Sequence, residues 1–212
     1  MGLCYAVRLR MNIAVLASHE GTTLQAVLDA CAAGRIAARV ALVISNNADS
    51  GALRRARAAG IGSTHLSSST HADPVRLDRA IAAALAQHRI DLVLLAGYMK
   101  KLGPVTREAY AGRILNTHPA LLPRFGGQGM YGALVHRAVL AAGERQSGAS
   151  IHLIDEGYDT GPVLAQVTVP VEAGDTEATL AARVQQAERT LLVEVLAEIA
   201  SGRRSLPGAR PV

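Results

Sequence analysis

The sequence predicts an α/β protein built on one doubly wound, mostly parallel sheet, with helices on both faces and added antiparallel strands toward the C-terminus. Two observations lead to this fold class. Short, wholly apolar runs of strand length alternate with helical patterns along the first half of the chain, as they do in βαβ units. Half of the 212 residues are hydrophobic but only 3% are aromatic, a mixture typical of small aliphatic helices that cover a buried parallel sheet.

The alternation begins near the N-terminus. The apolar run at 12–17 has the length of a strand buried on both faces, and the polar turn at 18–23 leads into a helical pattern that ends at Gly34. A second apolar run at 40–45 precedes a helix-like stretch that ends at Gly60. Strand, loop and helix therefore follow one another twice in succession.

The same order continues in the middle of the chain, where residues 71–88 have helical spacing and a wholly apolar strand follows at 91–97. This alternation predicts a Rossmann-like sheet, in which ligands bind at the carboxyl ends of the strands. We therefore expect one cleft to be lined by the segments that follow Ala17, Ala96 and Leu115.

The last third of the chain has a different pattern. Residues 150–155 and 163–171 alternate between apolar and polar side chains, which predicts antiparallel strands with one solvent-exposed face. A long amphipathic helix is expected from about Thr176 to Ile199. These elements complete one domain.

The domain is expected to span residues 11–202. Residues 1–10 precede the first predicted strand and are expected to form an N-terminal extension. The tail at 203–212 contains two prolines and three arginines, a composition that predicts disorder.

Charge and cysteine content argue against several classes of function. The net charge is +5, but the arginines are scattered among acidic residues and no basic run alternates with aromatics, so no nucleic-acid partner is expected. The positive charge instead favours small anionic ligands. Cys4 and Cys31 lack the spacing of metal ligands, so no metal is expected. No stretch has the length of a membrane span or the pattern of a signal sequence, so the expected location is the cytoplasm.

The most specific segment is ILNTHPALLPRF at 114–125. It ends an apolar strand and places Asn116 and His118 two residues apart, so on an extended strand both side chains face the same way. An amide donor and a titrating imidazole then converge on one point. The alternative is a capped strand end with a structural asparagine and a surface histidine.

NTHPALLP resembles the Asn-x-His-Pro-Ser-Leu-Leu-Pro signature of the folate-dependent formyltransferases, with Ala120 in place of the usual serine. The resemblance extends from about Met11 to Gly202, with the motifs in the family's order. It implies that Asn116 helps to hold the oxyanion formed when an amine attacks the formyl carbon. It also implies that His118 donates a proton to that intermediate or to its leaving group.

Asp159 lies in the segment GYDTGPVLAQ. An aspartate between glycines is, by itself, most often a turn residue. The segment resembles the family's Asp-x-Gly-Pro loop, which implies a catalytic carboxylate near the histidine. Because a neighbouring carboxylate raises the pKa of an imidazole, Asp159 is expected to keep His118 charged near neutral pH.

The first loop, SHEGTTLQAV, resembles the family loop that wraps a substrate phosphate with backbone amides at the start of a helix. Gly21 permits close approach, and the amides of Gly21, Thr22 and Thr23 attract an anion together with the helix dipole. His19 and Glu20 depart from the family pattern. A carboxylate beside a phosphate is unfavourable unless it points away.

Near the C-terminus, VQQAE resembles a family segment that touches the ribose of the substrate. Gln185 and Glu188 are three residues apart and share one helical face, so both are expected to bind ribose. A solvated helix face is the equally good alternative.

GYMKKLGP at 97–104 resembles the family segment whose backbone binds the pteridine of the folate. The alternative is a solvated basic loop. A family arginine that contacts the folate tail falls at Pro74, so Arg76 is expected to take its place. The resemblance thus implies folate contacts for Arg76, Met99, Lys100, Lys101, Leu102 and Asn116.

Two histidines and one glycine-rich segment have less specific interpretations. His136 resembles a family histidine near the substrate entrance, and His152 resembles another on a strand beside the site. Both are expected to be architectural. The segment GGQGMYG at 126–132 is expected to form a mobile flap over the cleft.

The resemblance implies transfer of a formyl group from the co-substrate 10-formyltetrahydrofolate to the amine of 5′-phosphoribosylglycinamide (glycinamide ribonucleotide), a step of de novo purine (IMP) biosynthesis. Members that formylate a tRNA or hydrolyse formyltetrahydrofolate carry a further domain for which this chain is expected to lack room. A formyltetrahydrofolate deformylase and a non-catalytic nucleotide-binding protein are the alternatives. A dehydrogenase is disfavoured because the first loop lacks GxGxxG. The sequence leaves monomer and homodimer open.

Overall fold

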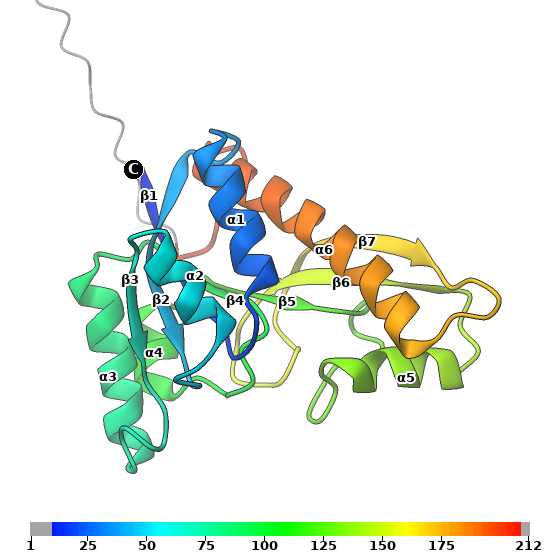
Figure 1. The fold of residues 1–212 in the computed structure, drawn as a ribbon, viewed down its shortest axis with the longest axis horizontal. Helices are drawn as coiled ribbons and strands as arrows, with labels where there is room; N and C mark the ends of the chain where they lie inside the picture. The colour runs from blue at the N-terminus through cyan, green and yellow to red at the C-terminus, as the bar shows by residue number, and fades with distance from the viewer. Residues whose placement is uncertain (1–9, 209–212) are drawn as a thin grey trace, which may run out of the picture.

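The computed structural model describes residues 10–208, which form a seven-stranded sheet covered by helices (Figure 1). The strands are β1 (Met11–Leu16), β2 (Ala38–Ser45), β3 (Gly62–His65), β4 (Leu92–Leu95), β5 (Ile114–His118), β6 (Gln146–Leu153) and β7 (Val163–Pro170). The helices are α1 (Thr22–Ala32), α2 (Gly51–Ala58), α3 (Pro74–Gln87), α4 (Pro104–Ala109), α5 (Ala133–Ala141) and α6 (Glu177–Ala200).

The order of the strands is β3-β2-β1-β4-β5-β6-β7. The first five strands of this order pair in parallel, whereas β6 pairs antiparallel with both β5 and β7. The predicted doubly wound sheet with antiparallel additions is therefore confirmed. The winding reverses between β1 and β4, which places the carboxyl ends of β1, β4 and β5 around one crevice.

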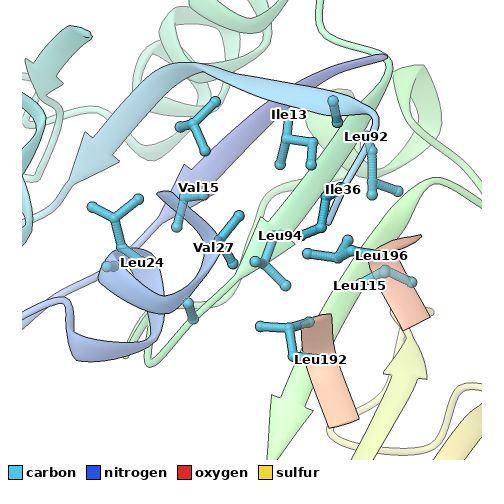
Figure 2. Close-up of a cluster of buried hydrophobic side chains, with 14 of the residues drawn as sticks. Ile13, Val15, Leu24, Val27, Ile36, Leu92, Leu94, Leu115, Leu192 and Leu196 are labelled. Atoms are coloured by element: carbon cyan, nitrogen blue, oxygen red, sulfur yellow. The ribbon is translucent and has the colours of Figure 1, made fainter. Parts of the chain in front are cut away.

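The central strands are buried on both faces because successive side chains point to opposite sides of the sheet. Val15 of β1 belongs to a cluster that includes Leu24 of α1 and Leu192 of α6 (Figure 2). Leu16, the next residue, belongs to a second cluster with Ile81 of α3. The continuous apolar runs in the sequence follow from this two-sided burial.

Three elements, β3, α4 and α5, were not predicted. β3 has the sequence GSTH and lies at the edge of the sheet, so it lacks the apolar run that marks the central strands. α4 has six residues, too few to show a helical period. α5 directly follows the glycine-rich segment that was expected to form a flap.

Strand β6 corrects the expected pattern of exposure, since all its residues after Gln146 are buried. Ala149 and Ile151 lie in clusters with residues of α6. The polar residues that alternate with them, Ser150 and His152, do not face solvent. Ser150 accepts a hydrogen bond from the Leu122 amide, and Nε2 of His152 lies 3.0 Å from Nδ2 of Asn116. The polar residues of β6 therefore form buried polar contacts and not a solvent-exposed face.

The end of the chain also differs from the expectation of a disordered tail at 203–212. Leu206 is buried in the main cluster, and Arg204 donates a hydrogen bond to the carbonyl of Leu164 at 2.6 Å. Residues 203–208 therefore pack against the fold, because one leucine and one arginine outweigh the surrounding prolines and glycines. Residues 1–9 and 209–212 lie outside the described residues. Within 10–208, none of the helices has both the length and the hydropathy of a membrane span.

Candidate active site

A cleft of about 760 Å³ opens at the carboxyl ends of β1, β4 and β5. The segments that follow these three strands all line it, as the predicted topology requires. The remaining walls come from the glycine-rich segment before α5, the loop between β6 and β7, and α6. The cleft thus collects residues that are far apart in the sequence.

Asn116 and His118 lie on β5 and both line this cleft, as their spacing predicts. Asp159 approaches them from the loop between β6 and β7. Its Oδ2 lies 3.4 Å from Nδ1 of His118, and its Oδ1 lies 3.5 Å from Nδ2 of Asn116. The structure therefore brings together the amide, imidazole and carboxylate that the sequence singled out.

His118 is only 3% exposed, and both ring nitrogens face oxygen atoms. Nε2 lies 2.8 Å from the carbonyl oxygen of Phe125, opposite the Nδ1 that faces Asp159. Burial lowers the pKa of His118 below its ordinary value, although the Asp159 carboxylate and the Phe125 carbonyl both raise it. The Asp159 carboxylate thus acts on this imidazole in the expected direction, and desolvation of the ring opposes it.

Asp159 has a left-handed backbone, with φ of 57°, and its Oδ2 accepts a hydrogen bond of 3.0 Å from the Gly127 amide. Burial raises the pKa of Asp159, but its bond to His152, the charge of His118 and the Gly127 amide together hold it below its ordinary value. The carboxylate is therefore ionised and aimed at the two histidines.

His152, expected to be an architectural histidine on a strand beside the site, lies against the candidate catalytic residues. It is fully buried, pairs with Asn116 across β5 and β6, and places Nε2 at 3.0 Å from Nδ2 of Asn116 and 3.4 Å from Oδ1 of Asp159. Its Nδ1 lies 2.9 Å from the carbonyl oxygen of Leu153 and donates to it. Only the antiparallel register places His152 opposite Asn116, and no local motif announces that register.

Gly21 begins α1 with φ of 70°, and the helix starts without a side-chain cap or an acidic residue in its first turn. Thr22 and Thr23 follow at the cleft wall, so the free amides of the first turn are available to an anion. A Cβ at Gly21 would lie 2.8 Å from Cα of Ala52, so a larger residue fits neither the conformation nor the space. The Glu20 carboxylate lies against Gly51 and pairs with Arg54 at 3.4 Å.

Gln185 and Glu188 of α6 both line the cleft, as expected of one helical face. Glu188 is 7% exposed, so it is not a solvated residue. Burial raises the pKa of its carboxyl, while hydrogen bonds from the hydroxyls of Thr117 and Thr23 lower it in part. Glu188 thereby links α6 to both β5 and the first loop.

Residues 99–102 line the cleft, and Leu102 among them is buried. Met99 donates its amide to Oγ of Ser18 at 2.8 Å, which joins this loop to the end of β1. The expectation for Arg76 is not met by the geometry. Its side chain is 81% exposed, lies 3.8 Å from Asp73 and is not part of the cleft wall. Arg107 of α4 lines the cleft instead, a position hidden in the sequence because α4 was not predicted.

The glycine-rich segment supplies six consecutive residues of the wall, 127–132. Tyr131 in it and Tyr158 on the opposite loop are both largely exposed. Lys101 lies over the Tyr158 ring at 4.7 Å. His136 follows in α5 and is buried with Nδ1 unpaired. Across residues 10–208 no group of histidine, cysteine or acidic side chains is arranged to hold a metal ion.

Comparisons with known proteins show the family to which this chain is similar. A family model described as formyl transferase matches residues 11–196. The phosphoribosylglycinamide formyltransferase of Escherichia coli is 41% identical over 91% of this chain and 89% of its own length. The enzyme of that name from Mycobacterium tuberculosis is 44% identical over 90% of this chain and 85% of its own. The crystal structure of glycinamide ribonucleotide transformylase 1 from Symbiobacterium toebii matches with a TM-score of 0.88 and 38% identity, covering 99% of this chain and 96% of that one.

Proposed function

The chain belongs to the formyl transferase family, and we propose that it transfers the formyl group of 10-formyltetrahydrofolate to the amine of 5′-phosphoribosylglycinamide in purine biosynthesis. Membership in the family confirms the predicted class of enzyme. The observation that carries the proposal is the convergence of Asn116, His118 and Asp159 in one cleft with an uncapped helix start. An acyl-transfer centre and an anion site then belong to the same cavity.

The chemistry that we assign to the cleft is acyl transfer between two nitrogens. The amine attacks the formyl carbon, a C–N bond forms, and the carbonyl oxygen becomes an oxyanion that Asn116 stabilises by donating a hydrogen bond. The bond from the carbon to N10 of the folate then breaks. His118 delivers the proton that N10 gains, and the proton that the attacking amine loses returns to the imidazole, so the charges balance.

Asp159 and His152 do not contact the reacting atoms and act through His118 and Asn116. Asp159 faces Nδ1 of His118 and favours its protonated form against the cost of burial. His152, whose tautomer is set by the Leu153 carbonyl, holds the amide of Asn116 in place. Rigid positioning of donors at the developing charge is the main source of rate in such sites.

The two substrates are assigned to opposite ends of the cleft. The phosphate binds the amides of residues 21–23, and the ribose hydroxyls face Gln185 and Glu188. The folate pteridine lies along residues 99–102, and we assign its glutamate tail to Arg107, which lines the wall together with Lys100 and Lys101. The folate is a co-substrate, and the proposed steps require no metal.

A formyl-transfer assay tests this assignment. Purified protein should form N-formylated glycinamide ribonucleotide only when both substrates are present. Release of formate from 10-formyltetrahydrofolate without the ribonucleotide would instead indicate a deformylase. Ribonucleotide binding with no turnover would indicate a non-catalytic protein.

A further inference from the structure

The loop before α1 is held from behind by α2, an arrangement that the assigned reaction does not explain. The carbonyl oxygen of His19 accepts a hydrogen bond of 3.1 Å from the Ala52 amide in the first turn of α2. The next carbonyl, that of Glu20, accepts a hydrogen bond of 2.9 Å from Nε of Arg55, one turn further along the same helix. Two successive carbonyl groups therefore point toward α2.

The direction of these carbonyls fixes the direction of the amides. In a trans peptide the C=O and the following N–H lie in one plane and point in opposite directions. Because the Glu20 carbonyl is turned toward Arg55, the N–H of Gly21 is turned away from α2, on the side of the cleft that Gly21 lines. A loop that binds an anion must expose amides and hide carbonyls, and here Arg55 hides the carbonyl.

Arg55 also bonds to the helix that the loop begins. Its Nη1 donates to Oε1 of Gln25 at 3.0 Å, and Nε2 of Gln25 donates in turn to Asp29 at 2.8 Å. One guanidinium thus holds the carbonyl just before Gly21 and the first turn of α1 just after it. The planar fork of arginine provides two donors in fixed directions, which a lysine does not.

We propose that Arg55 is a positioning residue that orients the Glu20–Gly21 peptide toward the substrate phosphate. This inference rests on the proposed function, because it takes the first loop as the phosphate site. Arg55 is outside the cleft wall and acts through the backbone, so its effect belongs to recognition of the phosphate and not to the formyl transfer.

The adjacent Arg54 has a different relation to the loop. It pairs with the Glu20 carboxylate at 3.4 Å, and both side chains are mostly exposed. Such an exposed pair contributes little to stability. It keeps the carboxylate of Glu20 over α2, where it faces cations rather than a bound phosphate.

The test compares Arg55→Gln with Arg57→Gln. Both variants remove one positive charge from α2, but Arg57 is an exposed residue of the last turn. For each protein, kcat and KM are measured for both substrates, together with the inhibition constant of ribose 5-phosphate. Arg55→Gln should raise the ribonucleotide KM and that inhibition constant by about tenfold or more, the effect of losing a charge-assisted hydrogen bond. In Arg55→Gln the folate KM and kcat should stay within about twofold of wild type. Arg57→Gln should leave the KM of both substrates unchanged.

Equal effects of the two variants would overturn the proposal, since charge alone would then account for the change. A rise of both Michaelis constants by the same factor would also overturn it. If Arg55→Gln lowers the melting temperature enough to impair folding, Arg55→Lys decides the matter, and the same selective rise is expected because the fork is lost while the charge is kept. If ribose 5-phosphate does not inhibit wild-type enzyme that is active in formyl transfer, the phosphate assignment itself is wrong.

Discussion

Asp159 joins the residues on which the proposed chemistry depends. Its two oxygens face His118, His152 and Asn116, and the Gly127 amide holds the carboxylate in place. Burial and the carboxylate act on the pKa of His118 in opposite directions, and burial prevails. The proton affinity of the imidazole is therefore a balance that a single substitution can shift.

Replacing Asp159 by Asn removes the group that raises the pKa of His118. The limb of the pH–rate profile that depends on protonated His118 should then move to lower pH, and turnover should fall by roughly 10²-fold or more, the scale of a weakened general acid. His118→Ala should cost at least as much, with substrate binding largely kept. The double variant should be little worse than His118→Ala alone, because residues that act as a unit are not additive. Fully additive losses would show that Asp159 works independently of His118.

The two arginines assigned in turn to the folate tail give a second prediction. Arg107→Gln should raise the folate KM several-fold, about 1 kcal/mol for one lost charge-assisted contact, and leave the ribonucleotide KM unchanged. Arg76→Gln removes the same charge from an exposed position outside the cleft wall and should leave both constants unchanged. Steady-state kinetics of the two variants decide between them. A rise in folate KM for Arg76→Gln alone would restore the assignment made from the sequence.

Single site residues were predicted best where they lie close together in the chain. The two-residue spacing of Asn116 and His118 on a strand predicted that both face one site, and the loop sequence predicted a helix start at Gly21. Asp159 was found only through its motif. His152 was expected beside the site, but its pairing with Asn116 was not foreseen because it depends on an antiparallel register. Arg107 was missed because it lies on a helix too short to recognise.

Helix α4 is held at its N-terminus by a side chain that is distant in the sequence. Asp78 of α3 is buried and accepts hydrogen bonds from the amides of Val105 at 2.7 Å and Thr106 at 3.1 Å, as well as from the Thr106 hydroxyl. These amides belong to the first turn of α4, so the carboxylate caps the helix from a neighbouring one. The loop that lines the folate end of the cleft ends at this cap.

Asp78→Asn should loosen that loop, because the NH2 of the new side chain is a donor and would face the donating amides of Val105 or Thr106. The melting temperature should fall, corresponding to about 1 kcal/mol or more for a lost helix cap. The folate KM should rise several-fold while the ribonucleotide KM stays near its wild-type value. Thermal melts and steady-state kinetics measure the two effects. Equal changes in both Michaelis constants would mean that Asp78 supports the fold as a whole and not the folate loop.

The elements themselves were predicted where hydrophobic periodicity is long and local. The central strands and the two longest helices, α3 and α6, show it clearly. The edge strand β3 lacks it. The exposure of β6 was mispredicted because Ser150 and His152 alternate with apolar residues as on a solvent-exposed strand, whereas they contact the buried Leu122 amide and Asn116.

For the whole molecule, buried imidazoles make stability depend on pH. Burial lowers the pKa of both His118 and His136 from their ordinary 6.5. Below that pH the unfolded chain takes up protons that the folded protein resists, so the free energy of unfolding declines as the pH falls. Asp159, with its lowered pKa, adds a further loss as the pH falls through its ordinary 3.8.

Urea unfolding midpoints should therefore be lower at pH 5.5 than at pH 7.5. His136→Gln should reduce this difference, because a residue that cannot bind a proton no longer contributes to it. The same midpoint at both pH values in the wild-type protein would contradict the prediction. A larger difference in the variant would mean that His136 is protonated in the folded state.

Glu188 has a consequence for which substrates the cleft can accept. Its carboxyl bonds to Thr23 beside the proposed phosphate site and to Thr117, which lies between Asn116 and His118. The carboxyl is buried on a 24-residue helix, so the two sites are held at one separation. A substrate with one methylene more or less between phosphate and amine can then satisfy one end but not both. We therefore expect the cleft to select by molecular length, in addition to the ribose contacts proposed for Gln185 and Glu188.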